Sequence, residues 1–158
     1  MAPVVERTKV LHLIGSTKDE WYHDLSFVYS RACDACKDLD RVEFEFCYAH
    51  VHQDGMWSFP STLSEEDVAK ADKMPIASAI ARITEISPDV MVPHMFCNDG
   101  MTWYRTLFDL LKIPFLGNKE YAVWPATDKA VTKQLLDAAG VQVPKGDLLV
   151  KGRTETTS

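Results

Sequence analysis

Short apolar segments alternate with amphipathic stretches over most of the chain, and this alternation constrains the fold more than any other feature. The segments with strand character are "KVLHLI" at 9–14, "VEFEFCYAHV" at 42–51, "DVMVP" at 89–93 and "IPFLG" at 113–117. Such runs are typical of buried strands. The stretches between them carry apolar residues at three- and four-residue spacing, which predicts helices. The sequence therefore predicts an α/β fold with a mainly parallel sheet, right-handed crossovers and helices on both faces.

The first expected helix has one apolar stripe, which consists of Trp21, Leu25, Val28, Tyr29, Ala32, Cys33 and Cys36. We interpret the Cys33-x-x-Cys36 pair as core packing, because a redox pair normally opens a helix, where the thiol pKa is lowered. Ser64 begins a capping box for a short helix. A longer helix follows at 75–86, with Pro75 in its first turn.

The remaining helices are expected in the second half of the chain. Residues 100–112 should form one helix, whose inner face carries Tyr104, Leu107, Phe108 and Leu111. Thr127 is a good N-cap for another helix, which Gly140 should end. The segment "DLLV" at 147–150 has the character of one more strand.

Composition and charge narrow the classes of function. A chain of 158 residues suits one domain with a real core. Its net charge of −6 argues against a nucleic-acid surface, which needs clustered Lys and Arg. No apolar run is long enough to span a bilayer, and the start has no secretory apolar region. The four cysteines suit a reducing compartment. We therefore expect a cytoplasmic protein without a membrane or nucleic-acid partner.

Two loops are the best candidates for a ligand site. In an open parallel sheet, ligands bind beyond the carboxyl ends of the strands, where the strand order reverses. If strand 9–14 lies between the next two strands, the loops at 15–20 and 94–100 meet at that point. Asp99 and Gly100 lead into a helix, whose free N–H groups favour an anion. In the alternative, Asp99 only caps its helix and His94 only bonds a backbone carbonyl.

Other motifs give weaker signals. Gly15 stands alone without a G-x-G-x-x-G pattern, which disfavours a dinucleotide cofactor. His50 and His52 lie on one face of a strand, but no third metal ligand is apparent nearby, so we expect a solvent-exposed pair. Lys129 falls in the first turn of its helix, where a cation opposes the helix dipole. That placement hints that an anion binds there.

Four stretches resemble the N-terminal part of D-alanine–D-alanine ligase-like enzymes of the ATP-grasp superfamily. They are "VLHLIGS" at 10–16, "HMFCNDGMT" at 94–102, "LFDLLKIPFLGN" at 107–118 and "TDKAVTKQLLDAAGVQVPKG" at 127–146. The likeness covers residues 9–150. It implies a three-layer Rossmann-like pre-ATP-grasp domain at 1–118 and the start of a truncated ATP-grasp domain at 119–158.

The resemblance also implies a reaction. In this family a carboxylate takes the γ-phosphoryl group of ATP, and an amine then displaces phosphate from the acyl phosphate, with Mg²⁺ and cationic side chains spreading the charge. By resemblance, Lys129 contacts the ATP phosphates. The substrate pocket would be bordered by Ser16, Tyr22, His94, Asp99 and Gly100. The implied partners are an amino acid, a second carboxylate substrate and a second copy of the chain in a homodimer.

The family's Mg²⁺ ligands and phosphate-covering loop would come after residue 158. We therefore name no catalytic or metal-binding residue and expect the chain alone not to be a competent ligase. The loop at 94–100 is one residue shorter than in the family, Asn98 replaces a Glu, and Tyr22 stands where a Glu holds the substrate amine. The segment 95–118 is more similar to ligases that add an amino acid to mycosporine-glycine.

Two further hypotheses stay open. The chain could instead be a non-catalytic small-molecule binding domain that keeps the crevice without the chemistry. It could also be the N-terminal half of a two-domain glycosyltransferase. The glycosyltransferase hypothesis leaves the segment from Asp128 to Pro144 unexplained.

Overall fold

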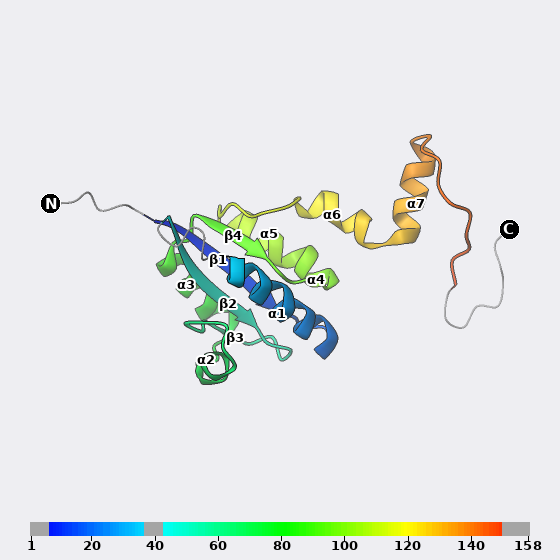
Figure 1. The fold of residues 1–158 in the computed structure, drawn as a ribbon. Coiled ribbons are helices and arrows are strands. Elements are labelled where there is room, and N and C mark those ends of the chain that lie inside the picture. Colours follow the sequence, from blue (N-terminus) through cyan, green and yellow to red (C-terminus); the bar gives the residue numbers. More distant parts are fainter. Residues whose placement is uncertain (1–6, 37–42, 150–158) are drawn as a thin grey trace.

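A computed structural model describes residues 7–36 and 43–149 and contains a four-stranded sheet (Figure 1). The strands are β1 (Thr8–Gly15), β2 (Phe44–Val51), β3 (Trp57–Ser58) and β4 (Val90–Pro93), in the order β3-β2-β1-β4. β1 pairs in parallel with β2 and with β4, and β3 is antiparallel to β2. The first strand therefore lies between β2 and β4, which is the condition under which the two candidate loops were expected to meet. β3 was not predicted, because two residues are too short to show an alternating pattern.

The expected strand at 113–117 lies beside β4 but forms only an isolated bridge. Phe115 pairs with Met91 in parallel. The Met91 N–H donates to the Pro114 carbonyl at 2.8 Å, and the Leu116 N–H donates to the Met91 carbonyl at 3.0 Å. Because Pro114 has no N–H, it cannot extend this ladder. The prediction was right about the position of the segment and wrong about a regular strand.

Helices cover both faces of the sheet. They are α1 (Glu20–Ala35), α2 (Glu65–Lys70), α3 (Ile76–Ile86), α4 (Asn98–Met101), α5 (Trp103–Leu110), α6 (Glu120–Thr127) and α7 (Lys129–Ala138). α1 lies on one face, α3 and α5 lie on the other, and α6 and α7 extend beyond them (Figure 1). The described part of the chain has no helix with the length and apolar character that a bilayer crossing requires. The fold is thus α/β and Rossmann-like, as predicted.

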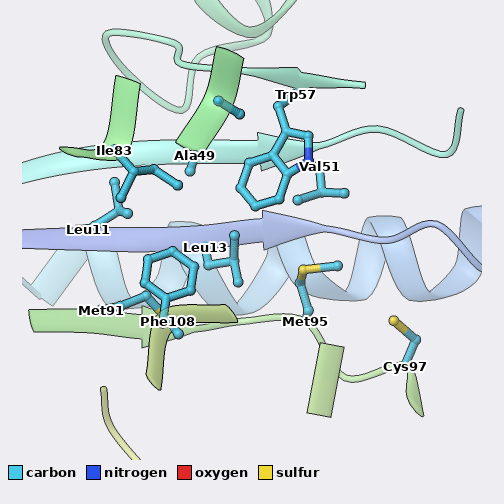
Figure 2. Close-up of a cluster of buried hydrophobic side chains, with 11 residues drawn as sticks. Leu11, Leu13, Ala49, Val51, Trp57, Ile83, Met91, Met95, Cys97 and Phe108 are labelled. Carbon is cyan, nitrogen blue, oxygen red and sulfur yellow. The ribbon is translucent and has the colours of Figure 1, made fainter. Parts of the chain in front are cut away.

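The main core lies between the sheet and α3 and α5 (Figure 2). Leu11 and Leu13 of β1 are fully buried there, together with Ile83 of α3 and Phe108 of α5. Burying each such side chain contributes about 1.5–3 kcal/mol. The residues expected on the inner face of helix 100–112 pack against this core. The helix itself is broken at Thr102, which has φ −119° and ψ −83° and separates α4 from α5.

The apolar stripe predicted for α1 does not face the sheet. The buried residues of α1 are Ser26, Phe27 and Ser30, whereas Trp21 is 65% exposed and both Cys33 and Cys36 are exposed. The Ser26 hydroxyl accepts a hydrogen bond from the Gly15 N–H at 2.8 Å. The helix therefore turns small hydroxyl residues toward the sheet, and the Ser26 hydroxyl accepts the hydrogen bond from the last N–H of β1. The core-packing interpretation of the cysteine pair was wrong.

Several local signals were correct. The Ser64 hydroxyl accepts from the Asp67 N–H at 3.1 Å and caps α2, and α3 begins directly after Pro75. Gly140, with φ +75°, follows the end of α7 as expected.

The last third departs from the predictions at three points. Thr127 ends the unpredicted helix α6, and Asp128 caps α7 instead, accepting from the Ala130 and Val131 N–H groups at 2.8 and 3.1 Å. A carboxylate that accepts two bonds is the stronger cap. No residue of α7 is buried. Residues 147–149 form no strand, and Val150 lies outside the described residues.

Gly15 provides a test of how tightly β1 and β2 are joined. Its φ is +99°, and an added Cβ would lie 2.0 Å from the Val51 carbonyl oxygen. We expect Gly15→Ala to lower the free energy of unfolding by about 2–4 kcal/mol, from backbone strain and overpacking together. Gly55→Ala is the matched control, since φ is also positive there but the space is open, and it should cost about 1 kcal/mol. Urea unfolding measures both variants, and an equal loss of unfolding free energy in Gly15→Ala and Gly55→Ala would contradict the packing explanation.

Candidate functional site

Hydrogen bonds within the loop between β1 and α1 hold it at the carboxyl edge of the sheet. Ser16 is fully buried. Its N–H donates to the Val51 carbonyl at 3.1 Å, and its hydroxyl accepts from the Lys18 N–H at 3.0 Å. Asp19 then caps α1 by accepting from the Tyr22 N–H at 2.9 Å. The Ser16 hydroxyl, a predicted substrate contact, thus supports the backbone of its own loop.

The second loop begins where β4 ends. The His94 N–H donates to the Leu13 carbonyl at 2.8 Å, which anchors the loop to β1. Cys97 caps α4, because its Sγ accepts from the Gly100 N–H at 3.4 Å. The alternative in which Asp99 caps the helix was therefore wrong. A Cβ on Gly100 would lie 2.2 Å from the Met95 Cβ, so this glycine lets α4 pack against its own loop.

The two loops meet at Thr17 and Asp99, as the sequence predicted. The Thr17 hydroxyl donates to Asp99 Oδ2 at 3.4 Å, and Thr17 also bonds the Tyr104 hydroxyl. Burial raises the pKa of Tyr104, the bond to Thr17 lowers it, and the nearby Asp99 carboxylate raises it. We name this group the Thr17–Asp99–Tyr104 cluster. Its three side chains, which offer a carboxylate and two hydroxyl groups, are all half-buried.

The start of α7 is connected to the second loop. The Thr127 hydroxyl lies 3.3 Å from Asn98 Oδ1, and α6 packs against α4. Lys129 is the first residue of α7 and lies two residues beyond this contact. With Lys133 and Asp137 it lines a groove between α7 and the segment 143–148. Whether Lys129 contacts ATP phosphates stays a prediction.

One group of possible metal ligands is found among the described residues. In residues 7–36 and 43–149, one group of three or more His, Cys, Asp or Glu side chains comes close enough to hold a metal ion, and it consists of His12, Cys33 and His94. Mg²⁺ prefers carboxylate, water and phosphate oxygens to imidazole and thiol donors. Lys129 and Lys133 of α7 place two cationic side chains in the groove beside the segment 143–148.

His94, a predicted substrate contact, lies under α1 and is 6% exposed. Its Nε2 lies 2.9 Å from Nδ1 of His12, and the two rings are nearly parallel, at 4°. Burial lowers the pKa of His94 to about 4, so the imidazole is neutral near pH 7. The partner of this nitrogen is a ring nitrogen rather than the backbone carbonyl that we had considered. A lone His12 inside an apolar strand was the signal that sequence reasoning missed.

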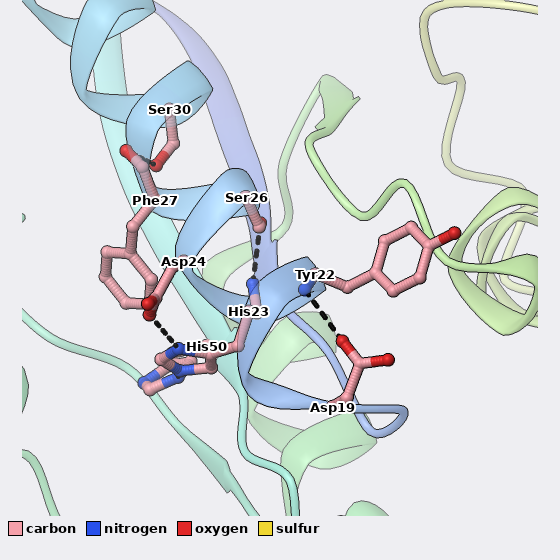
Figure 3. Close-up of polar contacts among 9 residues, drawn as sticks. Asp19, Tyr22, His23, Asp24, Ser26, Phe27, Ser30 and His50 are labelled. Carbon is pink, nitrogen blue, oxygen red and sulfur yellow. Dashed lines mark hydrogen bonds and ion pairs between the residues drawn. The ribbon is translucent and has the colours of Figure 1, made fainter.

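Tyr22 and a separate histidine group lie on opposite sides of the first turn of α1 (Figure 3). His23 Nε2 lies 2.9 Å from His50 Nε2, and the rings of His50 and His52 are 3.9 Å apart at their centroids. His50 is only 2% exposed, so the expected solvent-exposed pair was wrong. The third histidine, His23, comes from α1, so the sequence of β2 alone could not predict this group. Their ligand atoms do not form a metal-binding group in the described part of the chain.

Comparison with solved structures finds D-alanine–D-alanine ligases. The enzyme from Coxiella burnetii matches with a TM-score of 0.67 and 20% identity, over 95% of this chain and 47% of that one. The Helicobacter pylori enzyme matches with a TM-score of 0.60 and 14% identity, over 86% and 46%. The VanG D-Ala:D-Ser ligase from Enterococcus faecalis matches with a TM-score of 0.63 and 15% identity, over 89% of this chain and 44% of that one.

These TM-scores show that the fold is shared, and the chain spans about half the length of the ligases that it matches. No protein-family model matches the sequence. No curated protein matches it significantly either. The comparisons thus agree with the Rossmann-like fold that the structure has.

The buried histidines predict how stability depends on pH. Burial, His52 and His23 lower the pKa of His50 from 6.5 to about 3. Below about pH 6.5 the unfolded chain therefore binds more protons than the folded chain, and stability should fall as the pH falls. The slope for one such histidine approaches about 1.4 kcal/mol per pH unit. Urea unfolding between about pH 7 and about pH 5 should show a shallower slope in His50→Gln than in the wild type. Identical slopes would contradict the burial of a neutral His50.

Proposed function

We propose that the chain supplies the substrate-binding side of an ATP-dependent carboxylate–amine ligase of the D-alanine–D-alanine ligase-like type. In this proposal residues 1–118 bind substrate and residues 119–158 begin the ATP-binding part. The contact between Thr17 and Asp99 carries the proposal, because it joins two loops at the edge where open α/β sheets bind ligands. The shared fold with several such ligases supports it.

The chemistry of the Thr17–Asp99–Tyr104 cluster suits an amino acid. The Asp99 carboxylate, held by the Thr17 hydroxyl, can bind an ammonium group, while the Tyr104 hydroxyl can donate to a carboxylate. In the proposed reaction, ATP phosphorylates the substrate carboxylate, and the amine of the second substrate displaces phosphate to form an amide. The residues described here bind and orient the first substrate. The amino-acid sequence of residues 95–118 supports a mycosporine-type carboxylate as the first substrate.

A non-catalytic binding domain is the second candidate. Its support is that the Thr17–Asp99–Tyr104 cluster offers binding groups for an amino acid without involving a nucleotide. Both candidates predict amino-acid binding at the cluster. A measurement of ATP binding separates the two candidates. Only the ligase needs a nucleotide at the start of α7, so only the ligase predicts ATP binding that Lys129→Ala weakens. No observation favours the glycosyltransferase hypothesis.

Binding by the purified 158-residue chain tests the proposal. We would titrate D-alanine, glycine, L-serine and L-threonine, with propionate as the probe without an amine, and follow binding by NMR and calorimetry. Asp99→Asn should weaken amino-acid binding by about 10-fold or more, since a charged hydrogen bond contributes about 1.5–3 kcal/mol. It should leave any propionate binding nearly unchanged.

Asp109→Asn is the matched control. Asp109 lies on α5 and pairs with Lys119 at 2.9 Å, and neither residue belongs to the cluster. This variant should bind amino acids like the wild type. Failure of all four amino acids to bind, or equal losses in both variants, would reject the Thr17–Asp99–Tyr104 cluster as the substrate site.

A further inference from the structure

Three potential metal ligands converge between the sheet and α1. His12 comes from the middle of β1, His94 from the end of β4 and Cys33 from the second half of α1. One ligand atom from each residue lies within 4.8 Å of the other two. Because the residues are far apart in sequence, only the packing of α1 against two neighbouring strands brings them together. We propose that His12, Cys33 and His94 bind a zinc ion.

The two histidines are held in place before any ion binds. His12 lies in the stretch of β1 that pairs with β2 on one side and β4 on the other. The backbone of His94 is fixed by its bond to the Leu13 carbonyl at 2.8 Å. Both side chains are buried, at 1% and 6% exposure. Ligands on rigid strands lose little freedom when an ion binds, which favours affinity.

The facing ring nitrogens define where the ion would sit. His12 Nδ1 and His94 Nε2 lie 2.9 Å apart, and one proton lies between them, because two facing lone pairs would repel. Zinc would accept the lone pairs of both nitrogens, and the proton between them would shift to the other nitrogen of its own ring, so that both imidazoles stay neutral. Zn–N bonds of about 2.0–2.1 Å in a tetrahedral site require these nitrogens to separate by a few tenths of an ångström and the rings to turn so that both lone pairs point at the ion.

Cys33 completes the donor set and gives access to solvent. Its side chain is exposed on α1, so an ion can enter without opening the core. On binding, the thiol would release its proton and become the thiolate ligand. Two imidazoles and one thiolate suit Zn²⁺ rather than Mg²⁺ or Ca²⁺. Three protein ligands would leave the fourth position to water.

The experiment uses the reduced, metal-free 158-residue chain. Competition with a chromophoric chelator should show one Zn²⁺ per chain, with a dissociation constant of about 1 µM or tighter. Co²⁺ in place of zinc should give tetrahedral ligand-field bands and a thiolate-to-cobalt charge-transfer band. Cys33→Ser should abolish the charge-transfer band and weaken zinc binding by about 100-fold or more. This variant should fold normally, because Cys33 is exposed.

Cys36→Ser is the matched control, since Cys36 is also exposed and follows Cys33 by three residues but is not part of the metal-binding group. It should keep both the affinity and the charge-transfer band. His94→Asn should reduce the affinity as Cys33→Ser does, with circular dichroism confirming that it folds. Zinc should raise the Tm of the wild type and of Cys36→Ser but not of Cys33→Ser.

Three results would overturn the site. They are no zinc binding against the chelator, an equal loss in Cys33→Ser and Cys36→Ser, and full affinity in His94→Asn. The inference does not rest on the proposed ligase function, because the measured quantities are metal affinity, cobalt spectra and thermal stability. A chain that binds zinc but no amino acid would reject the proposed function and retain this site.

Discussion

The parallel pairing of β1 on both of its sides is the constraint on which the rest of the structure depends. β1 pairs with β2 from Thr8 to Gly15 and with β4 from Val10 to Leu13. Because these strands run in the same direction, the loops after β1 and β4 leave from the same edge of the sheet. Gly15 closes this edge, since its positive φ and missing Cβ let the Val51 carbonyl approach. The contact between Thr17 and Asp99 follows from that arrangement.

The two faces of β1 have different chemistry, and this difference separates the core from the polar sites. Leu11 and Leu13 point toward α3 and α5 and lie in the main core. The alternate residues His12 and Ile14 lie on the side of α1, where Ser26 is also buried. Because this interface is partly polar, His12 can lie close to His94, which follows β4, and to Cys33 of α1. The side of the sheet that contributes less to the apolar core therefore holds the proposed zinc site.

Local signals predicted β1, β2, β4 and several of the helix ends, because apolar runs, Ser64, Pro75 and Gly140 act through their own neighbours. Features that depend on distant partners were missed or wrong. The inward face of α1 is set by the bond from Gly15 to Ser26 rather than by its apolar stripe. Cys97 is an unusual helix cap, and the close approach of Gly100 to Met95 beside it joins residues of the same loop. The approach of Cys33 to His12 had no sequence signal at all.

The convergence of the two loops at the Thr17–Asp99–Tyr104 cluster is the central claim, and a double-mutant cycle tests it most directly. The free energy of unfolding would be measured for the wild type, Thr17→Val, Asp99→Asn and the double variant. A direct hydrogen bond between half-buried side chains predicts a coupling of about 0.5–1.5 kcal/mol. Effects that add to within about 0.3 kcal/mol would show that the two loops do not interact there.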